Sequence, residues 1–121
     1  MVQKKFIERG DIGEKLAAEF LLKLGYEIIS RNWRIRQGEI DIIAKDGRTI
    51  VFVEVKTAYG DKFGRPEEWV NTAKRRQIGK IAEAWIDKHN PEGYFFRFDV
   101  VALTKTPEGF DLNHIIDAFS L

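Results

Sequence analysis

The most informative segment of the chain reads Gly38-Glu-Ile-Asp-Ile-Ile-Ala-Lys45, then Asp46-Gly47, then Arg48-Thr-Ile-Val-Phe-Val-Glu-Val-Lys-Thr57. Both long stretches are rich in β-branched residues, which favour strands. Asp-Gly between two such runs is a strong signal for a β-hairpin. We therefore expect a hairpin with a two-residue loop at Asp46-Gly47, in which Lys45 faces Arg48.

That register decides which side chains share a face of the hairpin. It places Asp41 opposite Phe52 and Glu39 opposite Glu54, and alternation along a strand puts Lys56 on the same face. Nearer the turn this face is apolar enough to lie under a helix, through Ile43, Ile50 and Phe52. The opposite face is wholly apolar and must also be covered; it carries Ile40, Ile42, Ala44, Val51, Val53 and Val55.

The segment before the hairpin predicts a helix over Asp11–Leu24, because apolar residues recur every third or fourth position. Asp11 and Glu14 have the spacing of a capping pair at a helix start, and Gly25 is a suitable left-handed stop. A strand is expected next, over Tyr26–Arg34.

The rest of the chain adds a second helix and two strands. The expected order is α-β-β-β-α-β-β, typical of an α/β fold in which helices flank a mixed sheet. We expect one domain over residues 1–121. The further predicted elements are a loop over Thr57–Arg65, a helix over Asn71–His89, a strand over Tyr94–Leu103, and a tail over Phe110–Phe119 that forms a strand and a short helical end.

Composition narrows the function classes. The 121 residues are 44% hydrophobic and 32% charged, as in a folded globular protein. No cysteine is present, which excludes disulfides, thiolate nucleophiles and cysteine-ligated metals. His89 and His114 lack paired ligand spacing. The sequence contains no membrane-length apolar run and no signal peptide pattern, so we expect a cytoplasmic protein without membrane contact.

The acidic end of the hairpin carries the chemistry. At this end three acids, Glu39, Asp41 and Glu54, surround one lysine, Lys56. They leave unmatched negative charge, which a divalent cation with oxygen ligands would offset. Asp41 and Glu54 would each give one carboxylate oxygen, and the backbone carbonyl of Val55 a third. The residues alone equally allow a surface ion cluster, whose counter-ions would be Arg31, Arg34 and Arg36.

Lys56 lies two residues after Glu54 and therefore points the same way. Beside a metal ion, its ammonium group would hold the attacking water or offset charge on a phosphoryl transition state. Its alternative role is the counter-ion of Glu39 and Glu54.

These residues resemble a known pattern. Gly38–Ala44 followed by Phe52–Thr57 resembles the core of the PD-(D/E)XK nuclease superfamily, which is restriction-endonuclease-like and includes Holliday junction resolvases. Nearly the whole chain is similar to the YraN family of small uncharacterised bacterial proteins. That similarity extends over Gly10-x-x-Gly13-Glu14, Asn32-Trp33, the hairpin, Lys74, Arg97-Phe98-Asp99-Val100 and Ala118-Phe119.

The resemblance implies a phosphodiesterase site that uses Mg²⁺ or Mn²⁺. Asp41 and Glu54 match the metal-binding carboxylates, and Lys56 matches the catalytic lysine. Glu14 matches an acid on the first helix, which would reach the metal through water and competes with its capping role. The chain departs from the superfamily pattern at Ile40, where the name has proline, and from the YraN pattern at Ala58, where a basic residue is common.

Positive charge is concentrated in the middle of the chain, where residues 31–80 hold twelve basic and seven acidic side chains. Basic residues near a helix start favour a bound phosphate, although Glu67 and Glu68 could pair with them instead. Such contacts grip a nucleic-acid backbone without reading its sequence. The predicted nucleic-acid-binding residues are Lys74, Arg75, Arg76 and Gln77 on the helix, and Arg34 and Arg36 before the hairpin.

Together these features predict a metal-dependent endonuclease acting on DNA, in particular branched or damaged DNA; the same chemistry would also accept RNA. The alternative is a non-catalytic nucleic-acid-binding or protein-interaction module that keeps the nuclease fold. Resolvase-like relatives often pair, so a homodimer is compatible with either function. Asp99 would support the site indirectly or be satisfied by a neighbouring arginine. Trp33, Trp69 and Trp85 are more typical of a core than of a stacking surface.

Overall fold

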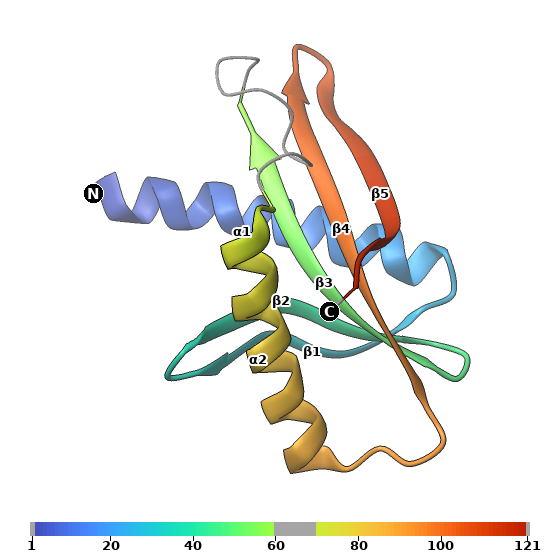
Figure 1. Cartoon of the computed structure of the whole chain (residues 1–121). Helices are drawn as coiled ribbons and strands as arrows, with labels where there is room; N and C mark the ends of the chain where they lie inside the picture. Colours follow the sequence, from blue (N-terminus) through green and yellow to red (C-terminus); the bar gives the residue numbers. More distant parts are fainter. Residues whose placement is uncertain (1, 60–69, 121) are drawn as a thin grey trace.

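The computed structural model describes residues 2–59 and 70–120, with the backbone alone described for residues 2–11. Gly60, Gly64 and Trp69 lie outside the described residues. Within these residues the order of elements is the one predicted (Figure 1). The elements are α1 (Val2–Lys23), β1 (Glu27–Ile35), β2 (Gly38–Asp46), β3 (Thr49–Ala58), α2 (Thr72–His89), β4 (Phe95–Thr106) and β5 (Gly109–Phe119).

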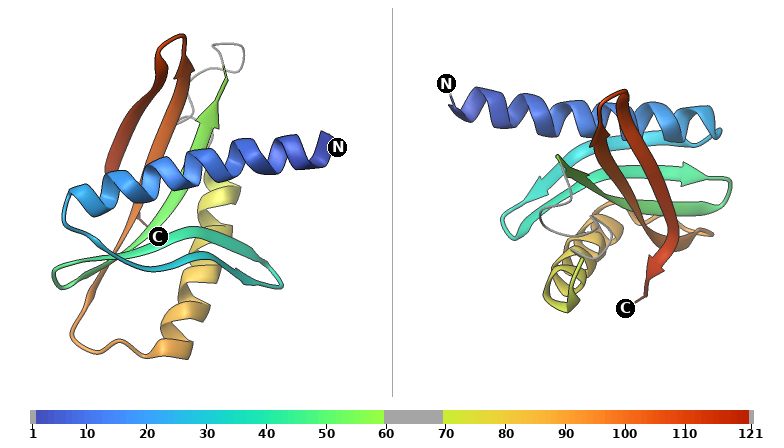
Figure 2. Two further views of the ribbon diagram at one scale, coloured as in Figure 1. Left: turned by 180° about the vertical axis from the view of Figure 1, so that it is seen from behind. Right: turned by 90° about the horizontal axis from the view of Figure 1, so that it is seen from above.

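The strands form a mixed sheet in the order β1-β2-β3-β4-β5. β3 and β4 run parallel and are connected through α2, whereas the other neighbours are antiparallel. α1 crosses one face of the sheet and α2 packs on the other, as the views from behind and above show (Figure 2). The structure thus confirms an α/β fold with helices flanking a mixed sheet.

Two apolar clusters, one on each face, hold the helices to the hairpin. Burying one large apolar side chain contributes about 2 kcal/mol, so each cluster fixes its helix firmly. The α1 cluster includes Ala17, Ala18, Leu21, Ile42, Ala44, Val51 and Val53. The α2 cluster includes Ile43, Ile50, Phe52, Ile81, Ala82 and Trp85.

The hairpin turn lies one residue later than predicted. Asp46 pairs with Thr49, so the two loop residues are Gly47 and Arg48. Gly47 has a φ of 59° and is the first central residue, the position at which a type II′ turn requires glycine. The predicted loop at Asp46-Gly47 would have placed this glycine second. The shift moves each cross-strand partner by two residues, which leaves every side chain on its predicted face.

Ile40 departs from the predicted face. It packs in the α2 cluster, beside Trp33 and Ile35, and not with Ile42 under α1. The last paired residues of β2 and β3 are Ile42 and Val53. Regular alternation therefore ends at Asp41, where the two strands part.

Three predictions about the ends of elements are wrong. α1 begins at Val2, not at Asp11, so Glu14 lies inside the helix and cannot cap its start. β5 continues to Phe119, so the tail has no helical end. β3 likewise continues through Thr57 and Ala58, which we expected in a loop. The predicted stop at Gly25 is confirmed by its φ of 92°.

Asp99 on β4 is fully buried and held by neighbours on three sides. Arg97 donates from Nε (2.8 Å), His114 Nε2 lies 2.7 Å from Oδ2, and the Asp117 N–H donates at 3.0 Å. Tyr26 completes this group through its hydroxyl, which accepts from Arg97 Nη2 at 2.9 Å. Asp99 is therefore satisfied by an arginine and a histidine, and it secures β5 to β4.

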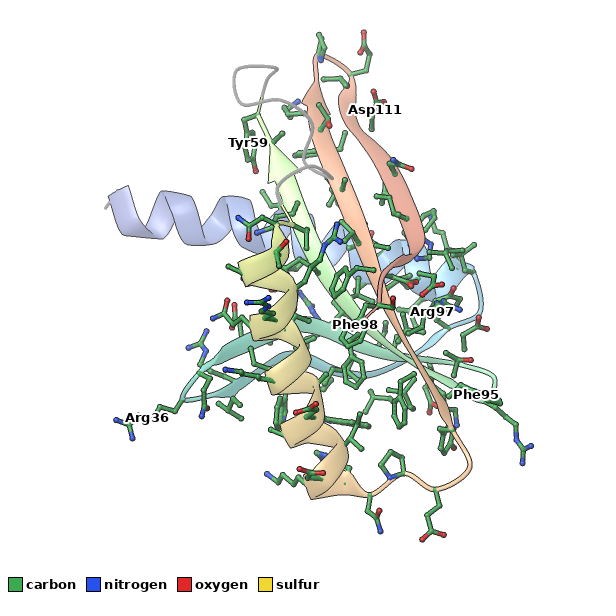
Figure 3. All side chains as sticks on the ribbon, in the orientation of Figure 1. Arg36, Tyr59, Phe95, Arg97, Phe98 and Asp111 are labelled. Atoms are coloured by element: carbon green, nitrogen blue, oxygen red, sulfur yellow. The ribbon has the colours of Figure 1, made fainter. Side chains whose placement is uncertain are left out.

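We predict that Asp99→Asn destabilises the protein. Burial alone would raise the pKa of Asp99, but the hydrogen bonds from His114 and Arg97 outweigh it and lower that pKa. This stabilisation is present above the unfolded-state pKa and is lost as the pH falls through the folded-state pKa. Asp99→Asn should cost about 3–5 kcal/mol at pH 7 and less in acid, measured by chemical denaturation. Exposed Asp111 on β5 (Figure 3) supplies the control Asp111→Asn, and equal losses in the two variants would contradict the role of Asp99.

Gly13 brings α1 close to the end of β3. A β-carbon at Gly13 would overlap the Thr57 hydroxyl and approach Leu103. This close approach places the next residue, Glu14, over the end of β3 that carries Glu54 and Lys56.

We predict that Gly13→Ala destabilises the protein only while Thr57 retains its hydroxyl. Overpacking typically costs about 1–3 kcal/mol, whereas alanine is favoured over glycine in a helix by about 1 kcal/mol. Thermal unfolding should therefore show a loss for Gly13→Ala alone and a gain for Gly13→Ala in a Thr57→Ala background. A loss of the same size in both backgrounds would show that the contact is not limiting.

Candidate metal centre

The centre is built where β2 and β3 separate. Beyond the Ile42–Val53 pair, the Asp41 carboxylate replaces a backbone acceptor, and its Oδ2 accepts the N–H of Val55 at 2.8 Å. Asp41 is only 9% exposed. A carboxylate thus occupies the gap between the strands and satisfies a backbone donor there.

Two further acids converge on Asp41. Carboxylate oxygens of Glu14, Glu39 and Asp41 lie within 4.8 Å of one another, and we call these three residues the acid cluster. Glu14 comes from α1 and Glu39 from the same strand as Asp41, two residues earlier. The arrangement could hold a metal ion, because carboxylate oxygens are the ligands that hard divalent cations prefer.

Two of the three arginines expected as counter-ions of a surface ion cluster, Arg34 and Arg31, lie beside these acids. Arg34 donates to Glu39 Oε2 from both Nε (3.2 Å) and Nη2 (2.8 Å), and Arg31 Nη2 lies 3.9 Å from Glu14. Glu14 and Glu39 are half-buried, and Arg34, the partner of Glu39, is exposed to solvent. A metal ion would therefore share these two acids with arginines.

Glu54 lies beside the acid cluster but is not part of it. Its side chain is 6% exposed and faces two lysines: Lys56 Nζ at 3.1 Å and Lys74 Nζ at 3.7 Å. Glu54 and Lys56 share the α2 face of β3, as predicted. The predicted proximity of Asp41 and Glu54 is reflected in the pKa of Asp41, which the Glu54 charge helps to raise.

The electrostatics of Asp41 are unusual for an aspartate. Burial, followed by repulsion from Glu54, raises the pKa of Asp41 to about 8, although the Val55 N–H opposes the shift. Glu14 and Glu39 add smaller repulsions in the same direction. Asp41 therefore holds a proton near neutral pH, and a divalent cation would displace that proton and remove the same repulsion.

The predicted nucleic-acid-binding residues differ in the contacts that they make. Lys74 reaches Glu54, while Arg75 donates to the Val70 carbonyl at 3.0 Å and lies over the Phe119 ring. Gln77 donates to the Gln37 carbonyl at 2.9 Å, and Arg34 is paired with Glu39. The other two members of the set are exposed: Arg76 lies on α2, and Arg36 lies at the tip of the β1–β2 hairpin (Figure 3).

Sequence reasoning assigned no ligand role to Glu39 and did not foresee the Lys74–Glu54 contact. The signal for Glu39 was available, because it lies two residues from Asp41 on one strand. Among the other residues considered, Trp85 is in the α2 cluster and Trp33 packs against it. His89 stacks on Trp85. A separate finding concerns membranes: none of the described helices is long and apolar enough to cross one.

Fold and centre together define a small α/β protein whose mixed sheet carries carboxylates able to hold a metal ion. The chain belongs to the uncharacterised protein family UPF0102, whose profile matches residues 13–103. This membership confirms the resemblance to the YraN family.

Two relatives illustrate how far the similarity extends. The UPF0102 protein of Caldicellulosiruptor saccharolyticus is 46% identical over 114 residues, covering 93% of this chain and 97% of the relative. That of Caldicellulosiruptor bescii is 55% identical over 95 residues, covering 78% and 80%. The similarity to the first of these relatives thus extends over nearly the whole of both chains.

We predict that Asp41→Asn stabilises the metal-free protein at neutral and alkaline pH. With a folded-state pKa near 8 and an unfolded-state value near 4, Asp41 favours folding below about pH 4, and this contribution is lost as the pH rises through 8. Asparagine cannot ionise and still accepts the Val55 N–H. The melting temperature of Asp41→Asn should exceed that of the wild type by about 4 °C or more at pH 8 and match it at pH 4.

Asp87→Asn, at an exposed position of α2, is the matched control and should follow the wild type at both pH values. A melting temperature for Asp41→Asn that stays below the wild-type value at pH 8 would show that Asp41 is not a strained carboxyl group.

Proposed function

We propose that this protein is a divalent-cation-dependent endonuclease that hydrolyses phosphodiester bonds of DNA. The observation that carries the proposal is the buried Asp41 carboxyl, whose oxygens lie with those of Glu14 and Glu39 beside the Glu54–Lys56 pair. A buried carboxyl that is repelled by its neighbours is unfavourable for stability, and carboxyls with perturbed pKa values in such clusters are typical of functional sites.

The donor set suits Mg²⁺ or Mn²⁺. Asp41 and Glu14 supply carboxylate oxygens from a strand and a helix, and Glu39 supplies a third. The N–H and carbonyl of a strand residue point to the same side, so the Val55 carbonyl faces the gap that its N–H faces. Glu54 would join this set on releasing a lysine. Bound there, a divalent cation lowers the pKa of water and offsets charge on a phosphoryl oxygen.

Lys56 is placed to act on the same phosphate. Its ammonium group lies 3.1 Å from Glu54, and a quarter of its side chain is exposed, so a substrate can reach it. From there Lys56 would position the attacking water or offset the charge that develops at phosphorus. The resemblance of the hairpin to PD-(D/E)XK nucleases supports these roles for Asp41, Glu54 and Lys56.

Binding of DNA through its backbone fits the exposed cations Arg36 and Arg76, because contacts to phosphates fix the position of a protein on DNA without reading its sequence. Recognition of DNA shape, as in branched or damaged DNA, is the expected source of selectivity. RNA offers the same phosphodiester and is a necessary comparison substrate.

One observation favours the alternative of a non-catalytic binding module. Glu14, Glu39 and Glu54 each have a cationic partner within 4 Å, as in a static ion network. In that case the fold would bind nucleic acid or a protein without cutting.

We predict cleavage that depends on a divalent cation and on three side chains. Duplex, single-stranded, flap and four-way DNA, with matched RNA, should be incubated with Mg²⁺, with Mn²⁺ and with chelator. Asp41→Asn and Lys56→Gln should each reduce the cleavage rate by about 100-fold or more while DNA binding persists. Glu14→Gln should act in the same direction.

Lys80→Gln, on the exposed side of α2, is the charge-matched control for Lys56→Gln and should cleave like the wild type. Binding to every substrate without any cut would favour the module, and cleavage unchanged by Asp41→Asn would refute the site.

A further inference from the structure

Glu54 is shared by two lysines from different elements. Lys56 follows it on β3, while Lys74 reaches it from the first turn of α2 on the same face of the sheet. The carboxylate is almost fully buried, but both lysine side chains keep a quarter to a third of their surface exposed. One carboxylate balances only one of the two ammonium groups, so the pair retains a positive charge toward solvent.

The two lysines are not equivalent. Lys56 Nζ lies at hydrogen-bond distance from Glu54 Oε1, at 3.1 Å, whereas Lys74 Nζ lies at 3.7 Å from the same oxygen. At the longer distance the contact is electrostatic and is weakened by water. Lys74 is thus the cation that Glu54 gives up more easily.

The position of Lys74 is unfavourable for helix stability. Its own backbone N–H donates to the Asn71 side chain at 2.9 Å, which places Lys74 in the opening turn of α2. A cation there opposes the helix dipole, while an anion at the same end is favoured. The neighbours Arg75 and Gln77 are engaged by backbone carbonyls, so Lys74 is the cation of this turn that faces the centre.

We propose that Lys74 is a phosphate-binding residue of this centre, which exchanges Glu54 for a phosphate oxygen of a phosphodiester substrate. The inference rests on the proposed function and assigns a separate role to each of the two lysines and to Glu54. Lys74 holds the substrate backbone, Lys56 acts at the reacting phosphate, and Glu54 is released toward the acid cluster. The exchange makes binding of the cation and of the substrate mutually favourable, because each takes one partner of the same ion pair.

Binding of a short labelled DNA duplex in Ca²⁺, measured across a salt series, tests this role. Lys74→Gln should weaken binding about tenfold at moderate salt and reduce the slope of log K against log salt by about 0.9, the value of one phosphate contact. Lys74→Arg keeps the charge and should keep the slope. Lys80→Gln, the same charge change on the same helix, should alter neither quantity.

Cleavage kinetics distinguish a substrate-binding role of Lys74 from a purely structural one. Lys74→Gln should raise KM for DNA much more than it lowers kcat, whereas Lys56→Gln should lower kcat. Melting temperatures of the Lys74 variants show whether either variant has lost its fold. If Lys74→Gln has, the salt slope of Lys74→Arg, which keeps the charge, tests the role of Lys74.

Failure of this inference is distinguishable from failure of the proposed function. A wild type that cleaves, with Lys74→Gln indistinguishable from Lys80→Gln, overturns the role of Lys74 alone. A wild type that binds DNA but cuts nothing overturns the nuclease proposal, and the salt slopes still decide whether Lys74 binds phosphate. A wild type that binds neither Mn²⁺ nor DNA overturns both.

Discussion

The hydrogen bond from the Val55 N–H to Asp41 is the constraint on which the rest of the centre depends. At that point β2 and β3 stop pairing. The Asp41 carboxylate accepts the hydrogen bond of the Val55 N–H, which a carbonyl of the neighbouring strand would otherwise accept. The bond fixes a nearly buried carboxylate between two strands, where burial and Glu54 oppose its ionisation. A group held in this way is unfavourable for stability and suited to binding a cation or a proton.

The hairpin shows how much of the fold could be predicted from the sequence. Strand alternation has a period of two, so the two-residue error in register left Ile43, Phe52 and Glu54 on their correct face. The position of the turn itself depended on whether Gly47 was the first or second loop residue, which Asp-Gly spacing does not decide. Ile40 was misplaced because alternation breaks where the strands part, and no sequence pattern marks that point.

The candidate centre was predictable in its strand residues and not in its tertiary contacts. Asp41, Glu54 and Lys56 follow from local spacing, whereas Glu14 depends on α1 approaching β3 closely enough for Gly13 to touch Thr57. The local pattern favoured a helix start at Asp11, and the longer helix removed the capping role of Glu14. The Lys74 contact likewise required the position of α2 against the sheet. In this protein the candidate centre therefore draws residues from both faces of the sheet, at the point where β2 and β3 separate.

The most direct test of the proposed metal centre is to locate Mn²⁺ by anomalous diffraction from crystals soaked at neutral pH. The account predicts one Mn²⁺ peak bound by Asp41 with Glu14 or Glu39, and Glu54 moved away from Lys74. Crystals that take up Mn²⁺ only elsewhere, with Glu54 still between its two lysines and Asp41 bound only to Val55, would contradict it.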